Sequence, residues 1–490
     1  MIIMRLRAII GGVDGINDRM LANSGPFNLI ANAMQHDMAP DFEVWRLPRK
    51  KFLFLTLLLP MLLACVTNAG AASHYIRDGG LGSTTGTGDC ATWEDAHACD
   101  QLPATLVRGD TYYIADGIYA GKTFNTTGTA LITIKKATGS DHGTEIGWSN
   151  AYGDGTATFT STLNFSTGYW LVDGISGGGP TNWTGPFGFK STATTEMLLY
   201  GDGASEITVR HIELSGVGSY NDRQAGLKAY HCVNCTLSYW YMHDIGLIPF
   251  FSAADNLLVE YGYMKNWYDG ASHSELCSCW AFGGGAIGTH TFRYNLFTDI
   301  RSTGGIMWDN STNHAAALQV YGNVFYKDPA VPMNNAANGV IAGWTGGNGE
   351  DFYNVHVINN TFINIPGAQI LSTFPIRSGS NEARNNLFYT ISNPGGENDW
   401  QTISANHFIS TSLIGTSPST SSGSPFVDMN GRNFNLTGPT PAGVALPAPY
   451  DVDMYGRKRG ADGVWDRGAV EFASGSGVTI PPAPTNLTVQ

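Results

Sequence analysis

The chain has 490 residues and a formal net charge of −13 at pH 7, with 42% hydrophobic, 11% aromatic and only 14% charged residues. Glycine occupies 61 positions, above the usual share of about 7%. A disordered chain would be richer in charge and poorer in aromatic residues, a nucleic-acid binder would normally carry a basic excess, and a helical bundle would contain less glycine. The composition therefore favours a large, turn-rich β protein with enough length for one large domain or two average ones.

The first 72 residues predict an export signal rather than part of the mature fold. Basic residues precede the apolar run 52–64 (FLFLTLLLPMLLA). This run is shorter than the roughly 20 residues of a membrane span. Together the two segments fit the basic n-region and the apolar h-region of a secretory signal. Small residues follow and offer a cleavage site. We therefore expect a secreted or periplasmic protein. The alternative is lipidation at Cys65, which would anchor an outer-membrane lipoprotein.

Without Cys65 the chain retains six cysteines, an even number that favours disulfides in an exported protein. Two of them flank a short segment and are expected to pair with each other. The other four form a C-x2-C and a C-x-C motif, for which disulfides are favoured over a zinc site that would include His231. In chain order the six are Cys90, Cys99, Cys232, Cys235, Cys277 and Cys279.

The body of the chain repeats one pattern. Each unit alternates apolar and polar residues with period two, which indicates strands, and the units are separated by loops of variable length rich in Gly, Asn, Ser and Pro. A unit this short cannot bury its own apolar face, so neighbouring units must stack. The units lie at 207–214, 235–245, 257–267, 290–300, 318–328, 355–365 and 381–391.

Aligned with one another, the units share a column that becomes asparagine in the last four. Asparagine tolerates the left-handed backbone conformation that a tight bend demands, and its amide can hydrogen-bond the same amide one coil further along, forming a ladder. The last four units also share the pattern N-x-F. We therefore predict a β-solenoid with an Asn ladder. The column contains Ile212, Trp240, Gly262, Asn295, Asn323, Asn360 and Asn386.

These units resemble the right-handed parallel β-helix of the pectin-lyase-like superfamily, over roughly 75–472. The segment Val464–Phe472 is similar to the D-x-G-A-x-E close of many exported bacterial β-helices. The resemblance implies an all-β fold with one β-helix domain at 73–473, followed by a Gly/Ser/Pro-rich tail or linker at 474–490. It specifies the fold and says little about activity, because one scaffold hosts many functions.

In that superfamily the Asn column marks the turn between the second and third strands of each coil, and the substrate groove runs along the first strands. Most of the first strands mapped in this way are apolar, but 271–276 (ASHSEL) is polar. His273 and Glu275 are two apart, so on a strand they share a face, and such a pair prefers solvent. The mapped first strands lie near 226–230, 248–252, 271–276, 304–308, 339–343 and 367–371.

Polar and aromatic residues gather around the coils at 226–308. Phe250 and Phe251 would offer a surface for sugar stacking, and Lys228 would lie roughly 10 Å from His273, since coils stack about 4.8 Å apart. In another column, His243 and Lys265 stack on consecutive coils at the end of the third strand. The candidate catalytic residues are His273, Glu275, Lys228, Arg301 and Tyr268. The candidate substrate-binding residues are Arg223, Phe250, Phe251, Lys265, His243 and Trp308.

This collection suits a polysaccharide lyase that cleaves an acidic, uronate-containing polysaccharide by β-elimination. The reaction needs a base for the C5 proton, a group that neutralises the carboxylate and an acid for the leaving oxygen. We assign the base to His273 or Lys228, the neutraliser to Arg301 and the acid to Tyr268. Glu275 would orient His273 or hold a cation. Calcium is the one cofactor considered, with Glu275 and Asp269 as candidate ligands.

Two other functions remain open on the same scaffold. A glycoside hydrolase would need two carboxylates about 5–9.5 Å apart, which Glu275 with Asp269 or Asp309 would supply. A non-catalytic surface protein would bind carbohydrate or an adhesion partner. In that case His273 and Glu275 form a solvated surface pair and Lys228 is an ordinary solvated side chain. Arg301 then anchors its own loop. We expect a monomer with a polysaccharide partner, no nucleic acid, and membrane attachment only through Cys65.

Overall fold

The computed structural model describes residues 71–79, 90–94, 98–268, 274–283, 285–299, 304–328, 339–343, 353–367, 369–372, 380–396 and 400–473. Residues 1–70 of the predicted export segment and the predicted tail at 474–490 lie outside these ranges. Ala72, predicted to precede the mature fold, already bonds to Asp110 and Thr111 of the first coil. Within the described ranges, no helix has the length and apolar character needed to cross a membrane.

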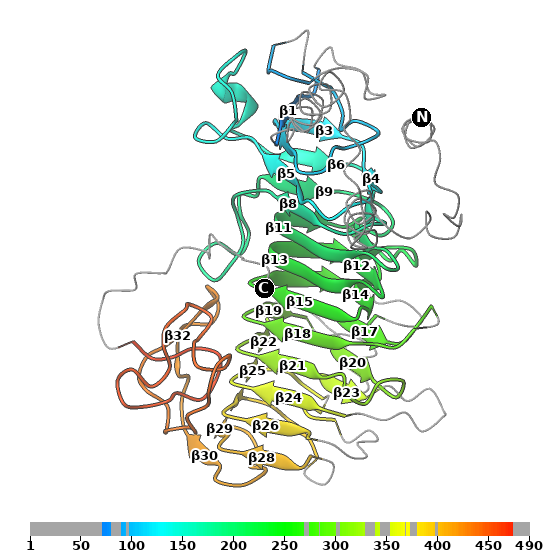
Figure 1. Cartoon of the computed structure of the whole chain (residues 1–490). Helices are drawn as coiled ribbons and strands as arrows, with labels where there is room; N and C mark the ends of the chain where they lie inside the picture. Colours follow the sequence, from blue (N-terminus) through cyan, green and yellow to red (C-terminus); the bar gives the residue numbers. More distant parts are fainter. Residues whose placement is uncertain are drawn as a thin grey trace, which may run out of the picture. The chain divides into compact units, whose positions relative to one another are not determined.

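The chain forms a right-handed parallel β-helix, as the repeats predict. The central coils contribute one strand to each of three parallel stacks, and successive coils pair in register (Figure 1). The first stack is a separate eight-stranded sheet, whereas the second and third are joined into one 22-stranded sheet. Two long strands join them, β11 (Ser205–Ser215) and β13 (Val233–Ile245), because each pairs with second-stack strands along its first half and third-stack strands along its second half.

The remaining strands are short, and their bounds follow the stacks. The first stack, in spatial order, contains β4 (Lys122–Phe124), β7 (Leu163–Phe165), β10 (Leu198–Tyr200), β12 (Ala225–Tyr230), β14 (Ile248–Ala253), β17 (Cys277–Trp280), β20 (Ile306–Asp309) and β23 (Ile341–Gly343). The second contains β1 (Ser73–Ile76), β2 (Thr111–Ile114), β5 (Ile132–Lys136), β8 (Trp170–Asp173), β15 (Asn256–Glu260), β18 (Thr289–Arg293), β21 (Leu318–Tyr321), β24 (Val355–Ile358), β26 (Glu382–Arg384) and β28 (Thr402–Ser404). The third contains β3 (Gly117–Tyr119), β6 (Ala157–Phe159), β9 (Phe189–Ser191), β16 (Tyr263–Trp267), β19 (Leu296–Thr298), β22 (Val324–Tyr326), β25 (Thr361–Ile363), β27 (Leu387–Tyr389), β29 (His407–Ile409) and β30 (Ser419–Ser421). An antiparallel pair, β31 (Phe426–Asp428) and β32 (Asn433–Leu436), follows the last coil, and one 3-10 turn, η1 (Asn150–Tyr152), lies near the first.

The predicted Asn ladder is present and is one coil longer than expected. The side-chain amide of each asparagine donates to the amide oxygen of the next, at 3.0 Å from Asn295 to Asn323, 3.0 Å from Asn323 to Asn360 and 3.1 Å from Asn360 to Asn386. A fifth member, Asn406, accepts from Asn386 at 3.0 Å. Each amide oxygen also accepts the backbone N–H of the preceding member, so the ladder satisfies buried donors at every turn.

The left-handed residue of this turn is one position earlier than predicted. Tyr294 has φ 57°, Asn359 has φ 55° and Asn385 has φ 55°, whereas the ladder asparagines are not in this region. The ladder position is instead fully buried, with its amide pointing into the coil. Asparagine is therefore selected there for its hydrogen bonds and not for its backbone freedom. The phenylalanines of the N-x-F pattern stack inside the coil, with ring centroids 5.0 Å apart from Phe325 to Phe362.

The C-terminal segment covers the outer face of the third stack. Phe426, Phe434 and Val470 pack with Tyr263 and Tyr326 in a second apolar cluster outside the coil. Figure 1 shows this segment, in orange and red, beside β19, β22, β25 and β29. It includes the predicted D-x-G-A-x-E close, whose role is therefore to cover one face of the β-helix.

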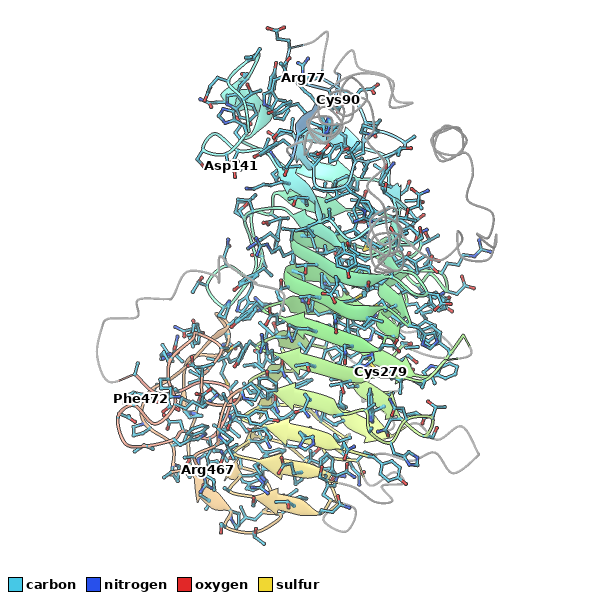
Figure 2. The ribbon with its side chains drawn as sticks, in the orientation of Figure 1. Arg77, Cys90, Asp141, Cys279, Arg467 and Phe472 are labelled. Atoms are coloured by element: carbon cyan, nitrogen blue, oxygen red, sulfur yellow. A yellow bond between two sulfur atoms is a disulfide. The ribbon has the colours of Figure 1, made fainter. Side chains whose placement is uncertain are left out.

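Buried ion pairs and carbonyl contacts hold this segment in place. The Arg467 guanidinium donates to the carbonyls of Ala442 and Asn406, and Arg459 lies 3.6 Å from Glu471. Figure 2 labels Arg467 in this segment. Because the third stack is covered in this way, its outer face does not provide an open groove over the last coils.

Two disulfides are present among the described residues. Cys90 pairs with Cys99, as predicted, and Cys277 pairs with Cys279 within β17, which Figure 2 labels at Cys279. Cys232 and Cys235 are buried free thiols. The four central cysteines therefore do not form a joint zinc site in this structure, because one pair is already cross-linked.

Candidate functional site

The outer face of the first stack carries the candidate site. Register places one outward-facing residue of each strand in a single row that runs along the sheet. The neighbouring inward row is aromatic or small and belongs to the core. The outer row contains Thr123, Asn164, Leu199, Lys228, Phe251, Ser278, Met307 and Ala342. The last three are buried, so the accessible part of the row runs from Thr123 to Phe251.

Lys228 is a positive charge held on this row by an acid and two aromatic rings. Its Nζ lies 3.2 Å from Glu196 Oε1, 5.3 Å from the ring centroid of Tyr230 and 5.6 Å from that of Phe251. Partial burial alone would lower the pKa of Lys228, but the contacts with Tyr230 and Glu196 outweigh it and raise that pKa above its ordinary value. Lys228 is therefore an ammonium at neutral pH, better suited to pairing with a carboxylate than to removing a proton.

Half-buried aromatic rings surround this charge, and we call Tyr230, Phe251, Trp280 and Phe282 the aromatic patch. Phe251 and Phe282 stack with centroids 4.2 Å apart and planes 3° from parallel. Tyr230 meets Phe282 edge-on at 5.0 Å, and Trp280 lies 5.6 Å from Phe282. None of the four is fully buried, so each presents part of an apolar ring beside a charge, a combination typical of ligand sites.

His231 holds the aromatic patch together from the turn that follows β12. Its Nε2 lies 2.8 Å from the carbonyl oxygen of Phe282, and its Nδ1 lies 3.9 Å from Asp255 Oδ1. Burial raises the pKa of Asp255, with the charge of Asp202 adding to this and that of His231 opposing it. His231 therefore fixes the backbone at Phe282 and so the stacking of that ring on Phe251.

The strand that was predicted at 271–276 lies at Cys277–Trp280 in the structure. The strand of this coil is β17 (Cys277–Trp280), which turns its two cysteines inward. Glu275 precedes this strand and is fully buried, with its Oε1 accepting from Ser278 Oγ at 2.9 Å. The prediction that Glu275 faces solvent is therefore wrong. The ASHSEL pattern alternates as a strand would. The C-x-C segment that follows it forms the strand instead, because its two cysteines fill the inward positions of the sheet.

Phe250 and Trp308 lie in the core and not on the groove. Both side chains are fully buried and point inward, since their register partners are inward residues such as Cys277 and Cys279. A sugar outside the sheet has no access to them. Of the predicted pair, Phe251 alone remains available for stacking.

Three predicted residues, His273, Asp269 and Arg301, lie outside the described residues. Two others lie just outside strands. Arg223 is exposed just before β12, and Tyr268 follows β16 with its backbone N–H donating to Ile245 at 2.8 Å.

The predicted His243 and Lys265 column exists and lies on the third stack, as expected. Register pairs the two residues on consecutive coils. The ring nitrogens of His243 lie 3.0 Å from Glu213 Oε1 and 2.7 Å from Asp244 Oδ2, and Lys265 lies over the Tyr241 ring. These residues form their own ion-pair cluster, and the structure does not bring them to Lys228.

The carboxylate pair considered for a glycoside hydrolase stays a prediction. The Glu275 carboxylate is held at Ser278, and register pairs Asp309 with Trp280, two residues further along β17. The described residues also contain no group of three or more His, Cys, Asp or Glu side chains that could hold a metal ion. Because Asp269 lies outside the described residues, calcium at Glu275 and Asp269 stays a prediction.

Sequence reasoning missed Glu196, Tyr230, Trp280 and Phe282. Tyr230 is the last residue of a correctly predicted strand. It lies two residues after Lys228, so the alternation of side chains could have predicted that both face outward. Trp280 and Phe282 follow the misplaced strand, and correct placement of β17 would have revealed them.

No family model and no curated protein matches this sequence. Several solved structures of lyases are similar in fold. The crystal structure of pectate lyase Pel9A is 13% identical with a TM-score of 0.41, covering 83% of this chain and 97% of its own. The PL6 family polysaccharide lyase Pedsa3628 from Pseudopedobacter saltans is 12% identical with a TM-score of 0.25, covering 71% and 95%. The PL6 family alginate lyase AlyGC is 13% identical with a TM-score of 0.32, covering 64% of this chain and 51% of its own, so the match spans about half of that lyase. Such distant likenesses concern architecture, and the site above rests on this chain's own residues.

Proposed function

We propose that the protein is an exported polysaccharide lyase that cleaves a uronate-containing polysaccharide by β-elimination on the outer face of the first stack. The observation that carries the proposal is the Lys228 ammonium set among the rings of the aromatic patch. A uronate has a carboxylate that pairs with an ammonium and an apolar ring face that packs on an aromatic side chain. The two disulfides support export, because disulfides persist in oxidising compartments.

Lys228 then serves as the neutraliser in the proposed reaction. Its ammonium pairs with the uronate carboxylate and stabilises the negative charge that develops there when the C5 proton leaves. A base removes that proton, the C–H electrons form the C4–C5 double bond, and the C4–O bond breaks. An acid gives its proton to the leaving oxygen.

The proposed base and acid are those predicted from the sequence, and the structure adds one further candidate for the acid. His273 remains the proposed base and Arg301 a second neutraliser, while Tyr268 remains a proposed acid. Tyr230 joins Tyr268 as a candidate acid, because its ring lies beside the Lys228 ammonium, with the centroid 5.3 Å from Nζ. Calcium at Glu275 and Asp269 is not used in any step.

The test is product chemistry with the purified full chain on polygalacturonate and alginate. We expect the absorbance of an unsaturated uronate to rise on at least one polymer, and Phe251→Ala to slow that rise without changing the unfolding midpoint. New reducing ends without this absorbance would indicate a hydrolase and contradict the proposal.

A second candidate, non-catalytic carbohydrate binding, draws on the same aromatic patch, because ring stacking needs no proton transfer. Binding of a uronate polymer that is lost in Phe251→Ala, without any new product, would identify this function instead.

A further inference from the structure

A recess lies on the same sheet face as Lys228, at the end formed by the first coil. It has a volume of about 430 Å³ and lies between the segment at 101–104 and β4 with its flanking residues. This is within the usual range of ligand pockets, roughly 300–1,000 Å³. Gly121 is at its wall, where an added Cβ would lie 2.4 Å from the carbonyl oxygen of Thr162, so the close approach of these two turns requires glycine.

Register links this recess to the candidate site. Thr123 in the recess pairs with Asn164, Asn164 with Leu199, and Leu199 with Lys228. The four residues therefore lie in one outward row, and three strand spacings of about 4.8 Å separate Thr123 from Lys228, roughly 14 Å. A single extended ligand lying along the row would reach both places.

The lining of the recess offers exposed polar groups. Thr123 and Asn125 both line it, and both are exposed. Across the described ranges of the chain, neither side chain has a protein hydrogen-bond partner. Leu102 and Ala104 add apolar surface.

Charge is absent from this lining except at Lys122, which is already engaged. Its Nζ donates to the carbonyls of Pro103 and Ala104, and burial lowers the pKa of Lys122. These bonds fix one wall of the recess against β4, and the Gln101 amide oxygen accepts the Ala120 N–H at 2.8 Å to the same effect. The recess is therefore preorganised and offers a hydroxyl and an amide beside the apolar side chains of Leu102 and Ala104.

We propose that this recess is a distal subsite that binds the hydroxyl groups of a sugar several units away from the one paired with Lys228. The inference rests on the proposed function in that the ligand is an oligosaccharide, but it requires binding only and no cleavage. It means that the protein recognises a stretch of polysaccharide lying along the coil axis, with charge recognition at one end and neutral recognition at the other.

The test measures binding by calorimetry with the full chain and oligogalacturonates and alginate oligomers from dimer to octamer. We expect affinity to rise in a step once the oligomer spans both places. Ala104→Trp, which fills the recess from an exposed position, should remove that step and weaken the longest oligomers about tenfold, equal to about 1.4 kcal/mol, while the dimer binds as before. Asn125→Ala should weaken the longest oligomers in the same selective way, and Ala461→Trp, exposed on the C-terminal segment, is the matched control.

The outcomes separate this inference from the proposed function. A length step that is lost in Ala104→Trp supports the subsite even if no polymer is cleaved. Cleavage by a protein whose affinity has no length step, or an Ala104→Trp variant that binds every length like the parent, overturns the subsite alone. Failure to bind any oligomer overturns both.

Discussion

Asn360 is the member of the ladder whose removal tests the coil architecture most sharply. Its amide oxygen accepts the Asn323 N–H and side-chain amide at 3.0 Å each, and its amide nitrogen donates to Val320 at 2.7 Å and to Asn386 at 3.1 Å. Asn360→Ala orphans the buried Asn323 N–H, at about 1–3 kcal/mol, and removes hydrogen bonds worth about 1 kcal/mol each. We expect the free energy of unfolding to fall by about 4 kcal/mol.

The assay is equilibrium unfolding in urea, followed by tryptophan fluorescence, with the midpoint and slope compared between variants. The control is Asn182→Ala at an exposed turn, which should stay within about 0.5 kcal/mol of the parent. A loss of stability in Asn360→Ala no larger than in this control would refute the reasoning, because a buried ladder amide cannot be removed without consequence.

Three further predictions follow from single side chains. Glu196→Gln removes the carboxylate that competes for the Lys228 ammonium, so KM for a uronate polymer should fall severalfold; an unchanged or higher KM would contradict the pairing. Burial lowers the pKa of His290 to about 4, below the unfolded value of about 6.5, so between these values the unfolded chain binds the extra proton and stability falls as the pH falls, by about 3 kcal/mol in all. Urea unfolding at several pH values should show a shallower decline for His290→Gln, and equal slopes would disprove the assignment. Cys232 and Cys235 are buried free thiols, so alkylation followed by mass spectrometry should label them only after unfolding; rapid labelling of the native protein would show that they are accessible.

The repeat was predictable because each coil obeys two local rules. Period-two alternation places apolar residues inside, and the ladder asparagine must recur wherever the turn needs its amide. The column from Ile212 to Asn386 is confirmed by the register of β11 to β27. The coil that contains Asn406 was not predicted, because its strands are short and its sequence departs from the repeated pattern.

The site was less predictable, because it depends on which residues each loop delivers to the sheet. Lys228 and Phe251 lie on the outer row, where they were expected. Phe250, which was expected beside Phe251, turns inward instead, because successive strand residues face opposite sides. Glu275 was misplaced because two alternating segments, ASHSEL and CSCW, compete for the same strand. The C-terminal segment covers the third stack through contacts between residues far apart in sequence, such as Tyr326 and Phe434. Local sequence patterns do not predict such contacts.

The most direct measurement of the central claim is kcat/KM of Lys228→Gln for formation of unsaturated uronate. The account predicts a fall of about 10²–10³-fold, as when one preorganised charge contact is lost, with the unfolding midpoint unchanged. Lys458→Gln, a lysine whose side chain is 64% exposed on the C-terminal segment, should retain full activity. A Lys228→Gln variant as active as this control would contradict the claim that the outer face of the first stack performs the chemistry.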